Sequence, residues 1–269
     1  MKKITFVILT WNSSKYIEKC LDSVNSISNF EVKIIIVDNG STDDTVEILK
    51  KYKKKIDNLS VVYLSQNMGT TKSRNIALKI VEEDTDYICI LDSDTIINEN
   101  AIKVMTEYLS ENHNVALVGP AMVNEKDEKQ IPYRKFPSWK IKILKAFPIK
   151  KISRLGEKIE NYPIDFVSDE FECDYLISAC WMMEYSMYEK LGNLDEKIFY
   201  SPEDVEYCMR ARSKGYKIVH LKKAKIIHLY QRISKKKLIS KVNFSHLLGI
   251  NYVLKKYKKF LKEYKKVKE

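Results

Sequence analysis

Two aspartates, Asp92 and Asp94, are the residues that most clearly suggest chemistry in this sequence. They follow a short apolar run (87–91) and have one residue between them. Two carboxylates this close repel each other, and burial raises the pKa of at least one of them. A divalent cation removes the repulsion, because Mg²⁺ and Mn²⁺ take oxygen ligands and bind through carboxylates together with substrate phosphates. We therefore expect a metal–diphosphate site at the end of this run.

Polar clusters also end three other apolar runs, which span residues 4–9, 32–38 and 59–64. In an open parallel sheet, ligands bind beyond the carboxyl ends of the strands. Taken singly, each cluster is also compatible with a turn or a helix cap, and Ser41 or Thr42 is a suitable cap for the helix that follows. Together they predict a binding site at one sheet edge. The clusters are Thr10-Trp11-Asn12, Asp38-Asn39-Gly40-Ser41 and Asn67-Met68-Gly69.

The first 120 residues alternate apolar runs with longer amphipathic segments. Strands are predicted at 4–9, 32–38, 59–64, 87–91 and 115–119, and helices over about 14–27, after 42, 71–82 and 98–110. This alternation predicts an α/β fold with a mainly parallel central sheet flanked by helices. The second half is less regular, with strands expected at 172–185, 216–221 and 225–230 and a helix at 205–214. Residues 121–170 give no clear pattern.

The basic character of the chain belongs to its C-terminal segment. Residues 232–269 contain thirteen Lys and Arg against two Glu, whereas residues 1–231 contain 34 basic and 34 acidic side chains. We expect a body over residues 1–231 and a basic helical tail over 232–269, with a break near Gly249. The apolar face of the tail either packs on the body or lies on an anionic membrane surface. That face comprises Tyr257, Phe260, Leu261, Tyr264 and Val267. A neutral body without a reader motif disfavours nucleic acid as a partner.

Composition narrows the class of protein further. The five cysteines are scattered without CxxC spacing, so we expect reduced thiols that pack in the core rather than disulfides or a zinc site. We expect the three tryptophans to pack in the core as well, with stacking on a sugar or a nucleobase as the alternative. The opening MKKITFVIL carries only a short apolar run before Trp11 and Asn12, which indicates a first strand and a cytoplasmic protein. No GxxxxGK[ST] or GxGxxG motif occurs, which argues against a P-loop nucleotidase or a dinucleotide-binding fold.

Several stretches together resemble the inverting, nucleotide-sugar-dependent glycosyltransferases of family 2, which have the GT-A fold. They are VILTWNSSKYIEKCLDSV, IIIVDNGSTDDT, NMGTTKSRNIAL, ILDSDT and LGNLDEKIFYSPEDVEYCMRARSKGYKIVHLKKAKIIH. The resemblance covers residues 4 to about 228 and is nearest to a subgroup described as rhamnosyl- or galactosyltransferases. It divides the body into a nucleotide-binding half (about 1–120) and an acceptor half (about 121–231). Ser178-Ala179-Cys180 departs from the glycine usual in the family, and residues 132–170 match nothing and are expected on the acceptor side.

The resemblance implies roles for individual residues. Asp94 would ligate a divalent metal, Mg²⁺ or Mn²⁺, directly. Asp92 would face both the ribose and the metal, and His228 would lie near the diphosphate or metal. Asp204 would be the general base, with Glu203 as the alternative. Arg74 and Asn75 match a recurrent pair without an assigned contact. The remaining residues would bind the nucleotide-sugar: Thr10, Asn12, Asp38, Asn39, Ser41, Asn67 and Gly69.

These residue types suit glycosyl transfer from a nucleoside-diphosphate-sugar to an acceptor hydroxyl. A carboxylate within reach of the hydroxyl acts as general base, and a metal neutralises the leaving diphosphate. The expected product is a cell-surface polysaccharide or glycolipid, and the expected acceptor is a glycan or lipid-linked glycan. That acceptor is compatible with a protein peripheral to the cytoplasmic face of the membrane. The alternatives are a nucleotide-sugar-binding protein without turnover and a membrane-surface module on the same fold.

Overall fold

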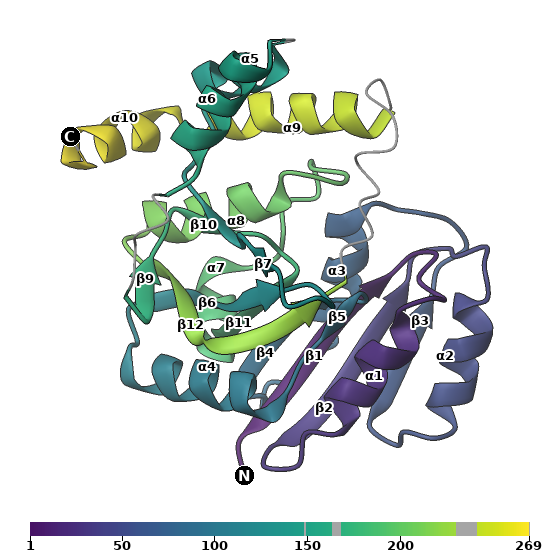
Figure 1. Cartoon of the computed structure of the whole chain (residues 1–269). Coiled ribbons are helices and arrows are strands. Elements are labelled where there is room, and N and C mark those ends of the chain that lie inside the picture. Colours follow the sequence, from purple (N-terminus) through teal and green to yellow (C-terminus); the bar gives the residue numbers. More distant parts are fainter. Residues whose placement is uncertain (148, 163–167, 230–240, 269) are drawn as a thin grey trace.

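The computed structural model describes residues 1–147, 149–162, 168–229 and 241–268. Its main sheet has the strand order β3-β2-β1-β4-β11-β6-β12-β5 (Figure 1), and β7 and β9 pair with β6 and β12. The main-sheet strands are β1 (Lys3–Thr10), β2 (Glu31–Asp38), β3 (Leu59–Tyr63), β4 (Tyr87–Asp92), β5 (Thr95–Ile96), β6 (Val115–Val123), β7 (Lys129–Gln130), β9 (Glu170–Glu172), β11 (Cys180–Glu184) and β12 (Lys217–His228). A separate pair is formed by β8 (Tyr133–Arg134) and β10 (Tyr175–Leu176).

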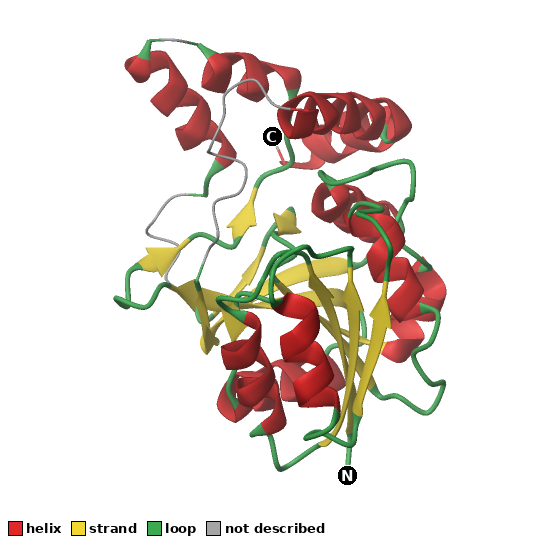
Figure 2. Ribbon diagram, turned by 90° about the vertical axis from the view of Figure 1, so that its right-hand side faces the viewer, coloured by secondary structure: helices red, strands yellow, loops and turns green. Residues whose placement is uncertain are grey.

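Helices cover both faces of this sheet (Figure 2), because successive residues of a buried strand point to opposite faces. On β1, Phe6 and Ile8 belong to one core and Val7 to the other. The first core includes residues of α1 (Ile17–Asn25), α2 (Thr45–Lys53) and α4 (Glu99–Glu111). The second includes residues of α3 (Thr70–Leu78), α7 (Tyr185–Leu191), α8 (Glu203–Ser213) and α9 (Lys241–Lys256). The expectation of an α/β fold with helices on both faces is confirmed.

The sheet is parallel in its first half and mixed in its second. β3, β2, β1 and β4 pair in parallel, as do β6 and β12. β11 runs antiparallel between β4 and β6, with Trp181 opposite Ile90 and Met182 opposite Val118. One antiparallel strand thus joins two parallel groups, and the sheet is mainly parallel as predicted.

Four predictions of secondary structure are wrong in detail. The single strand expected at 172–185 is divided among β9, β10 and β11, since the buried carboxylate of Asp174 accepts hydrogen bonds from Tyr162 and the Phe136 amide where a strand would continue. The two strands expected at 216–221 and 225–230 form one strand, β12, with a register shift between Leu221 and Lys225; residue 230 lies outside the described residues. Neither Ser41 nor Thr42 caps α2, whose N-cap position is Asp44. The helix expected over 71–82 ends at Leu78.

The described part of the C-terminal segment consists of α9 and α10 (Lys258–Lys268), and the helix break falls at Tyr257 rather than near Gly249. Val253 of α9 is fully buried, and further side chains of both helices and of the break between them pack against the second core: Tyr252, Leu254, Tyr257, Phe260, Leu261 and Tyr264. Residues 232–240 of the expected tail and the boundary at 231 lie outside the described residues. Among the described residues, no helix combines the length and apolar character needed to cross a bilayer.

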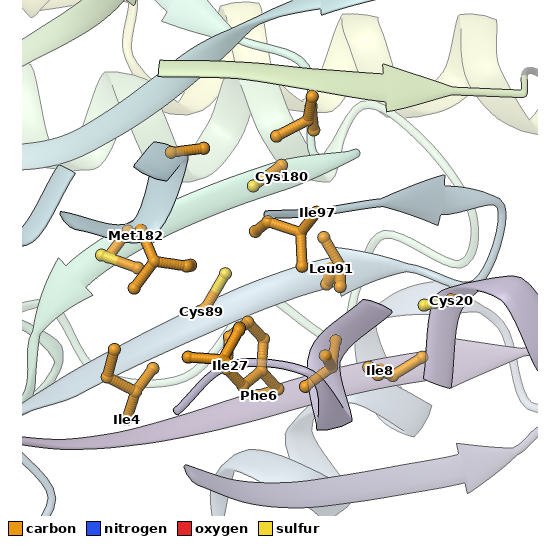
Figure 3. Packing of buried hydrophobic residues seen from close by; sticks show 14 of the residues in the cluster. Ile4, Phe6, Ile8, Cys20, Ile27, Cys89, Leu91, Ile97, Cys180 and Met182 are labelled. Atoms are coloured by element: carbon orange, nitrogen blue, oxygen red, sulfur yellow. The ribbon is translucent and has the colours of Figure 1, made fainter. Parts of the chain in front are cut away.

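Three of the five cysteines lie in the first core, and Cys173 and Cys208 lie in the second. Figure 3 shows Cys20, Cys89, Cys180 and Met182 among Ile and Leu side chains between the sheet and its helices. All five cysteines are buried and free, which confirms the expected thiols. Of the tryptophans, only Trp181 is buried; Trp11 and Trp139 are 38% and 45% exposed, so the expectation that they pack in the core is wrong.

Candidate active site

Strand register brings the predicted polar clusters to one sheet edge. In the parallel pairing, Thr10 at the end of β1 lies opposite Asp38 at the end of β2, and Leu9 lies opposite Asp92 at the end of β4. Because the residues just before these strand ends are apolar and mostly buried, the polar residues that follow them emerge together where the strands stop.

Asp38 is the centre of the first group of contacts at this edge. Its carboxylate is buried and accepts hydrogen bonds from the hydroxyls of Thr10 (3.1 Å) and Ser41 (2.5 Å) and from the Ser41 amide (3.1 Å). The Ser41 hydroxyl accepts from the Asn12 amide (2.9 Å), and Asn12 Oδ1 accepts from the Thr42 amide (2.8 Å). Thr10, Asn12, Asp38 and Ser41 are therefore joined in one network that orders both loops.

Asn39 and Asn67 form the adjoining group. Asn39 Nδ2 donates to Asn67 Oδ1 (3.1 Å), and Asn39 Oδ1 accepts from the Met68 amide and the Ser73 hydroxyl, both at 2.8 Å. Asn67 Oδ1 also accepts from the Gly69 amide (2.9 Å). These contacts fix the loop between β3 and α3 against the end of β2.

Gly69 fits a position that no other residue can occupy without movement. Its φ is +85°, and an added Cβ would lie 2.2 Å from the Phe199 carbonyl oxygen. The Thr70 amide donates to that same oxygen (2.6 Å), and the Thr71 hydroxyl donates to the Ile198 carbonyl. Gly69 thus lets the segment that precedes Glu203 lie directly on the start of α3.

Arg74 connects this edge to Glu203. Its guanidinium forms an ion pair with Asp92 and donates from Nη1 to Glu203 Oε1 (3.3 Å), which also accepts from the Ser178 hydroxyl (2.9 Å). The Arg74 side chain is 2% exposed, Glu203 7% and Asp92 35%. Burial raises the pKa of Asp92 above its ordinary value; Arg74 opposes this shift and Asp94 adds to it.

The second metal-binding candidate, Asp94, lies beside His228. The ligand atoms of Asp92, Asp94 and His228 all lie within 4.8 Å of one another, and Asp94 Oδ1 is 3.5 Å from His228 Nε2. Burial acts to lower the pKa of His228, but the hydrogen bond and charge of Asp94 raise it above its ordinary value. Two carboxylates and one imidazole are a suitable donor set for a divalent cation such as Mn²⁺.

Gln130 orients His228 for this role. Gln130 Nε2 donates to the His228 carbonyl oxygen (2.7 Å), so its Oε1 is the atom that faces His228 Nδ1 at 2.8 Å. Since Oε1 only accepts, Nδ1 carries the hydrogen and Nε2 is left to bind a metal, after loss of any proton it carries. The three residues therefore fit a metal site.

Glu203 and Asp204 lie together at the start of α8 but in different surroundings. Burial, with the charge of Asp204, raises the pKa of Glu203 to about 8 although Arg74 opposes the shift. Burial also raises the pKa of Asp204, against the hydrogen bond from the Val205 amide (2.8 Å) and the charges of Arg134 and Lys142. Asp204 is the more exposed of the two. Among the described residues, Asp204 accepts this hydrogen bond from Val205 and forms none with Asp38, Asp92 or Asp94.

The sequence did not reveal the roles of two residues whose partners lie far away along the chain. Arg74 matched a recurrent Arg-Asn pair but carried no assigned contact, and Gln130 gave no signal, since its partner lies 98 positions away. A cavity of about 330 Å³ lies near the metal-site candidates but is lined by other residues, among them Asn98, Asp127 and Lys225.

The fold is the GT-A fold of glycosyltransferases. A solved structure of GalNAc-T7 with UDP, GalNAc and Mn²⁺ matches 95% of this chain and 48% of that chain, with a TM-score of 0.69 and 14% identity. A structure of Staphylococcus aureus TarS, residues 1–349, matches 85% of this chain and 60% of that chain, with a TM-score of 0.56 and 24% identity. At these identities the likeness shows the fold alone.

The sequence identifies the family. The model of glycosyl transferase family 2 matches residues 5–192, and the chain belongs to that family. Poly(ribitol-phosphate) β-N-acetylglucosaminyltransferase TarS of S. aureus is 35% identical over 121 residues, 44% of this chain and 21% of that protein. The glycosyltransferase MG060 of Mycoplasma genitalium is 25% identical over 238 residues, 86% of this chain and 70% of that protein. This chain thus spans about a fifth of the length of TarS.

Proposed function

We propose that this protein is an inverting glycosyltransferase that moves a sugar from a nucleoside-diphosphate-sugar to an acceptor hydroxyl. The observation that carries the proposal is the meeting of Asp92, Asp94 and His228 within 4.8 Å at one edge of a GT-A sheet. The Asp38 network lies at the same edge. The roles given below to individual residues are part of the proposal.

The nucleotide binds at the ends of β1, β2 and β3. Asp38, together with Thr10, Asn12, Asn39 and Ser41, contacts the base and ribose, and the loop containing Asn67 and Gly69 shapes the nucleotide pocket. TarS structures that contain UDP and UDP-GlcNAc make uracil the first base to test. Asp92, Asp94 and His228 would hold Mg²⁺ or Mn²⁺, a Lewis acid that offsets charge on the diphosphate.

Asp204 is the general base in this mechanism. It takes the proton of the acceptor hydroxyl as the hydroxyl oxygen forms a bond to the anomeric carbon. The bond from that carbon to the diphosphate breaks, and the diphosphate leaves with the electron pair. Attack from the face opposite the leaving group inverts the anomeric configuration. A pKa raised by burial makes Asp204 a stronger base than an exposed aspartate, while Glu203, with a pKa of about 8, is protonated at neutral pH.

The acceptor is an anionic cell-surface polysaccharide or a lipid-linked glycan. Arg134 and Lys142 bear electrostatically on Asp204, and Lys145 adjoins them through the shared partner Glu160. These three cations share one buried glutamate, so the group carries excess positive charge that suits the phosphate groups of an acceptor. The name of the relative TarS describes a phosphate polymer as the acceptor of that protein. We place the enzyme at the cytoplasmic face of the membrane, where the exposed lysines of α10 add a minor electrostatic attraction to anionic lipid.

Isothermal titration with UDP, GDP and dTDP, each with and without Mn²⁺, tests the donor site. Binding of one nucleotide that strengthens at least tenfold with Mn²⁺ supports the proposal, and Asp94→Asn should remove the gain. If no nucleoside diphosphate binds, the proposal is wrong. If a nucleotide-sugar binds but no sugar is transferred or hydrolysed with any acceptor extract, the protein is a nucleotide-sugar-binding protein instead.

A further inference from the structure

The helical hairpin of α5 (Trp139–Ala146) and α6 (Lys150–Glu160) exposes an unusual number of large apolar side chains. Exposed fractions are 61% for Ile143, 54% for Ile149 and 49% for Leu155. Trp139 and Phe147 are 45% and 44% exposed. Trp139, Ile143 and Phe147 are spaced by four residues, so they share one side of α5 and its C-terminal end. An exposed apolar patch of this kind marks an interaction surface.

The hairpin that carries these exposed side chains is well packed on its inner side. Ile141 is 5% exposed on the other side of α5. Gly156 of α6 lies so close to α5 that an added Cβ would be 2.8 Å from Lys145 Cγ. Glu160 at the end of α6 is buried and forms ion pairs with Lys145 and Arg134. The inner faces are thus packed, and the outward apolar side chains are a fixed feature of the surface.

Exposed positive charges occur on the same two helices as the exposed apolar side chains. Residues 139–160 contain seven Lys and Arg and two Glu. The cations that are exposed are Lys140, Lys150, Lys151, Arg154 and Lys158, and the one exposed acid of these helices is Glu157. A helix pair that exposes Trp, Phe, Ile and Leu together with several Lys and Arg has the composition of an element that lies in a membrane interface. The exposed cations select anionic headgroups over a neutral partner.

We propose that the α5–α6 hairpin docks this protein on an anionic lipid bilayer, with Trp139, Ile143, Phe147, Ile149 and Leu155 inserted at the level of the headgroups. The tail differs, because the apolar side chains of α10 pack against the body and leave mainly lysines exposed. Inserted apolar groups and exposed cations act together, so binding depends on both.

The position of the hairpin connects this surface to the candidate active site. Figure 1 shows α5 and α6 beyond α8, beside α9 and away from the chain's N-terminus. Lys142 of α5 lies 3.4 Å from His246 of α9, and His246 lies 3.0 Å from the hydroxyl of Ser201, two residues before Glu203. A bilayer under the hairpin would therefore face the acceptor side of Asp204, where a lipid-linked acceptor would enter.

Co-sedimentation of the full chain with vesicles tests the proposal. We expect binding to vesicles of phosphatidylcholine and phosphatidylglycerol (3:1) and at least tenfold weaker binding to phosphatidylcholine alone. Ile143→Ser/Phe147→Ser/Leu155→Ser should weaken binding to anionic vesicles at least tenfold. Lys150→Gln/Lys151→Gln/Arg154→Gln should do the same and lower the sensitivity to salt. Brominated lipid should quench Trp139 fluorescence, and this quenching should disappear in Trp139→Phe.

Matched controls separate docking from folding and from donor binding. Ile80→Ser removes an apolar side chain that is 46% exposed at the end of α3 and should leave vesicle binding unchanged. Lys258→Gln/Lys259→Gln/Lys262→Gln removes exposed charge from α10 and should retain most of the binding. All variants should keep the wild-type melting temperature and nucleotide affinity. Unchanged vesicle binding in the apolar triple variant would overturn the proposal. It would also be overturned if the wild-type protein is a dimer and the triple variant loses the dimer instead of vesicle binding.

Discussion

Arg74 Nη1 lies 3.3 Å from Glu203 Oε1, although 129 positions separate the two residues in the sequence. The same guanidinium pairs with Asp92, so one side chain spans the metal-site candidates and the start of α8. Arg74 is the second-largest fully buried side chain of the described residues. Burying a charged side chain is unfavourable unless ion pairs and hydrogen bonds compensate for its lost hydration. Arg74 is therefore held in place by Asp92 and Glu203, and it is the central positioning residue of the candidate site.

Arg74→Met should lower the free energy of unfolding by about 2 kcal/mol, because it removes hydrogen bonds between a charged group and two carboxyl groups. Most of this cost arises at Glu203, since Asp92 is 35% exposed and is partly screened by solvent. Urea denaturation measures the effect. Lys72→Met, at an exposed position of the same helix, is the control and should change stability by less than about 0.5 kcal/mol. Equal values for the two variants would contradict this role.

The strands around the site could be predicted from the sequence, whereas the Arg74–Glu203 contact could not. Strands such as 4–9 and 87–91 were predictable because a buried parallel strand is apolar along its whole length. The polar residues that end these strands, Thr10 and Asp92, follow from the same pattern. Arg74 reaches Glu203 because Gly69 allows the segment around Phe199 to lie directly on the start of α3. No local pattern in the sequence predicts this close contact.

The second half of the chain shows the same limit in its secondary structure. The run 172–185 was predicted as one strand, yet Asp174 breaks it by binding Tyr162 and the Phe136 amide from distant segments. The pairing of His228 with Gln130 likewise depends on β7 and β12, which meet β6 from opposite sides. Short strands and long-range side-chain contacts carry little periodic signal, so these parts needed the structure.

Asp204→Asn should lower kcat by about 10²–10⁴-fold and leave nucleotide affinity unchanged, since the amide keeps the shape but cannot take a proton. Glu203→Gln is the matched variant, because a neutral amide resembles the protonated carboxyl expected from a pKa of about 8. It should keep most of the activity and bind Arg74 and Ser178 as before. Steady-state kinetics with UDP titration separates the two. A greater loss in Glu203→Gln than in Asp204→Asn would assign the base to Glu203.

Gln130→Leu should weaken Mn²⁺ affinity by about 10–100-fold, because the variant frees His228 to rotate and to exchange tautomers. Titration of Mn²⁺ followed by electron paramagnetic resonance measures free and bound ion directly. Lys129→Leu, the neighbouring exposed residue of β7, is the control and should bind Mn²⁺ as the wild type does. If His228→Ala and Gln130→Leu both leave the affinity unchanged, the metal is held by Asp92 and Asp94 without the imidazole.

His220 should make the protein lose stability in acid. Its ring lies 4.6 Å from that of Tyr133 and is 7% exposed, and burial lowers its pKa from 6.5 to about 4. Between those two values the unfolded chain binds more protons than the folded one, so stability is complete above pH 6.5 and falls as the pH drops towards 4. The difference of about 2.5 pKa units corresponds to about 3 kcal/mol.

His220→Phe should therefore reduce the loss of unfolding free energy between pH 7 and pH 4.5 by about 2–3 kcal/mol, since phenylalanine keeps the ring contact but takes no proton. Urea denaturation at both pH values gives the comparison. Phe171→Leu alters the same aromatic group, because Phe171 lies 5.0 Å from Tyr133. It should lower stability equally at the two pH values. A wild-type pH dependence in His220→Phe would mean that other groups, such as His246 with its pKa of about 4, dominate the acid response.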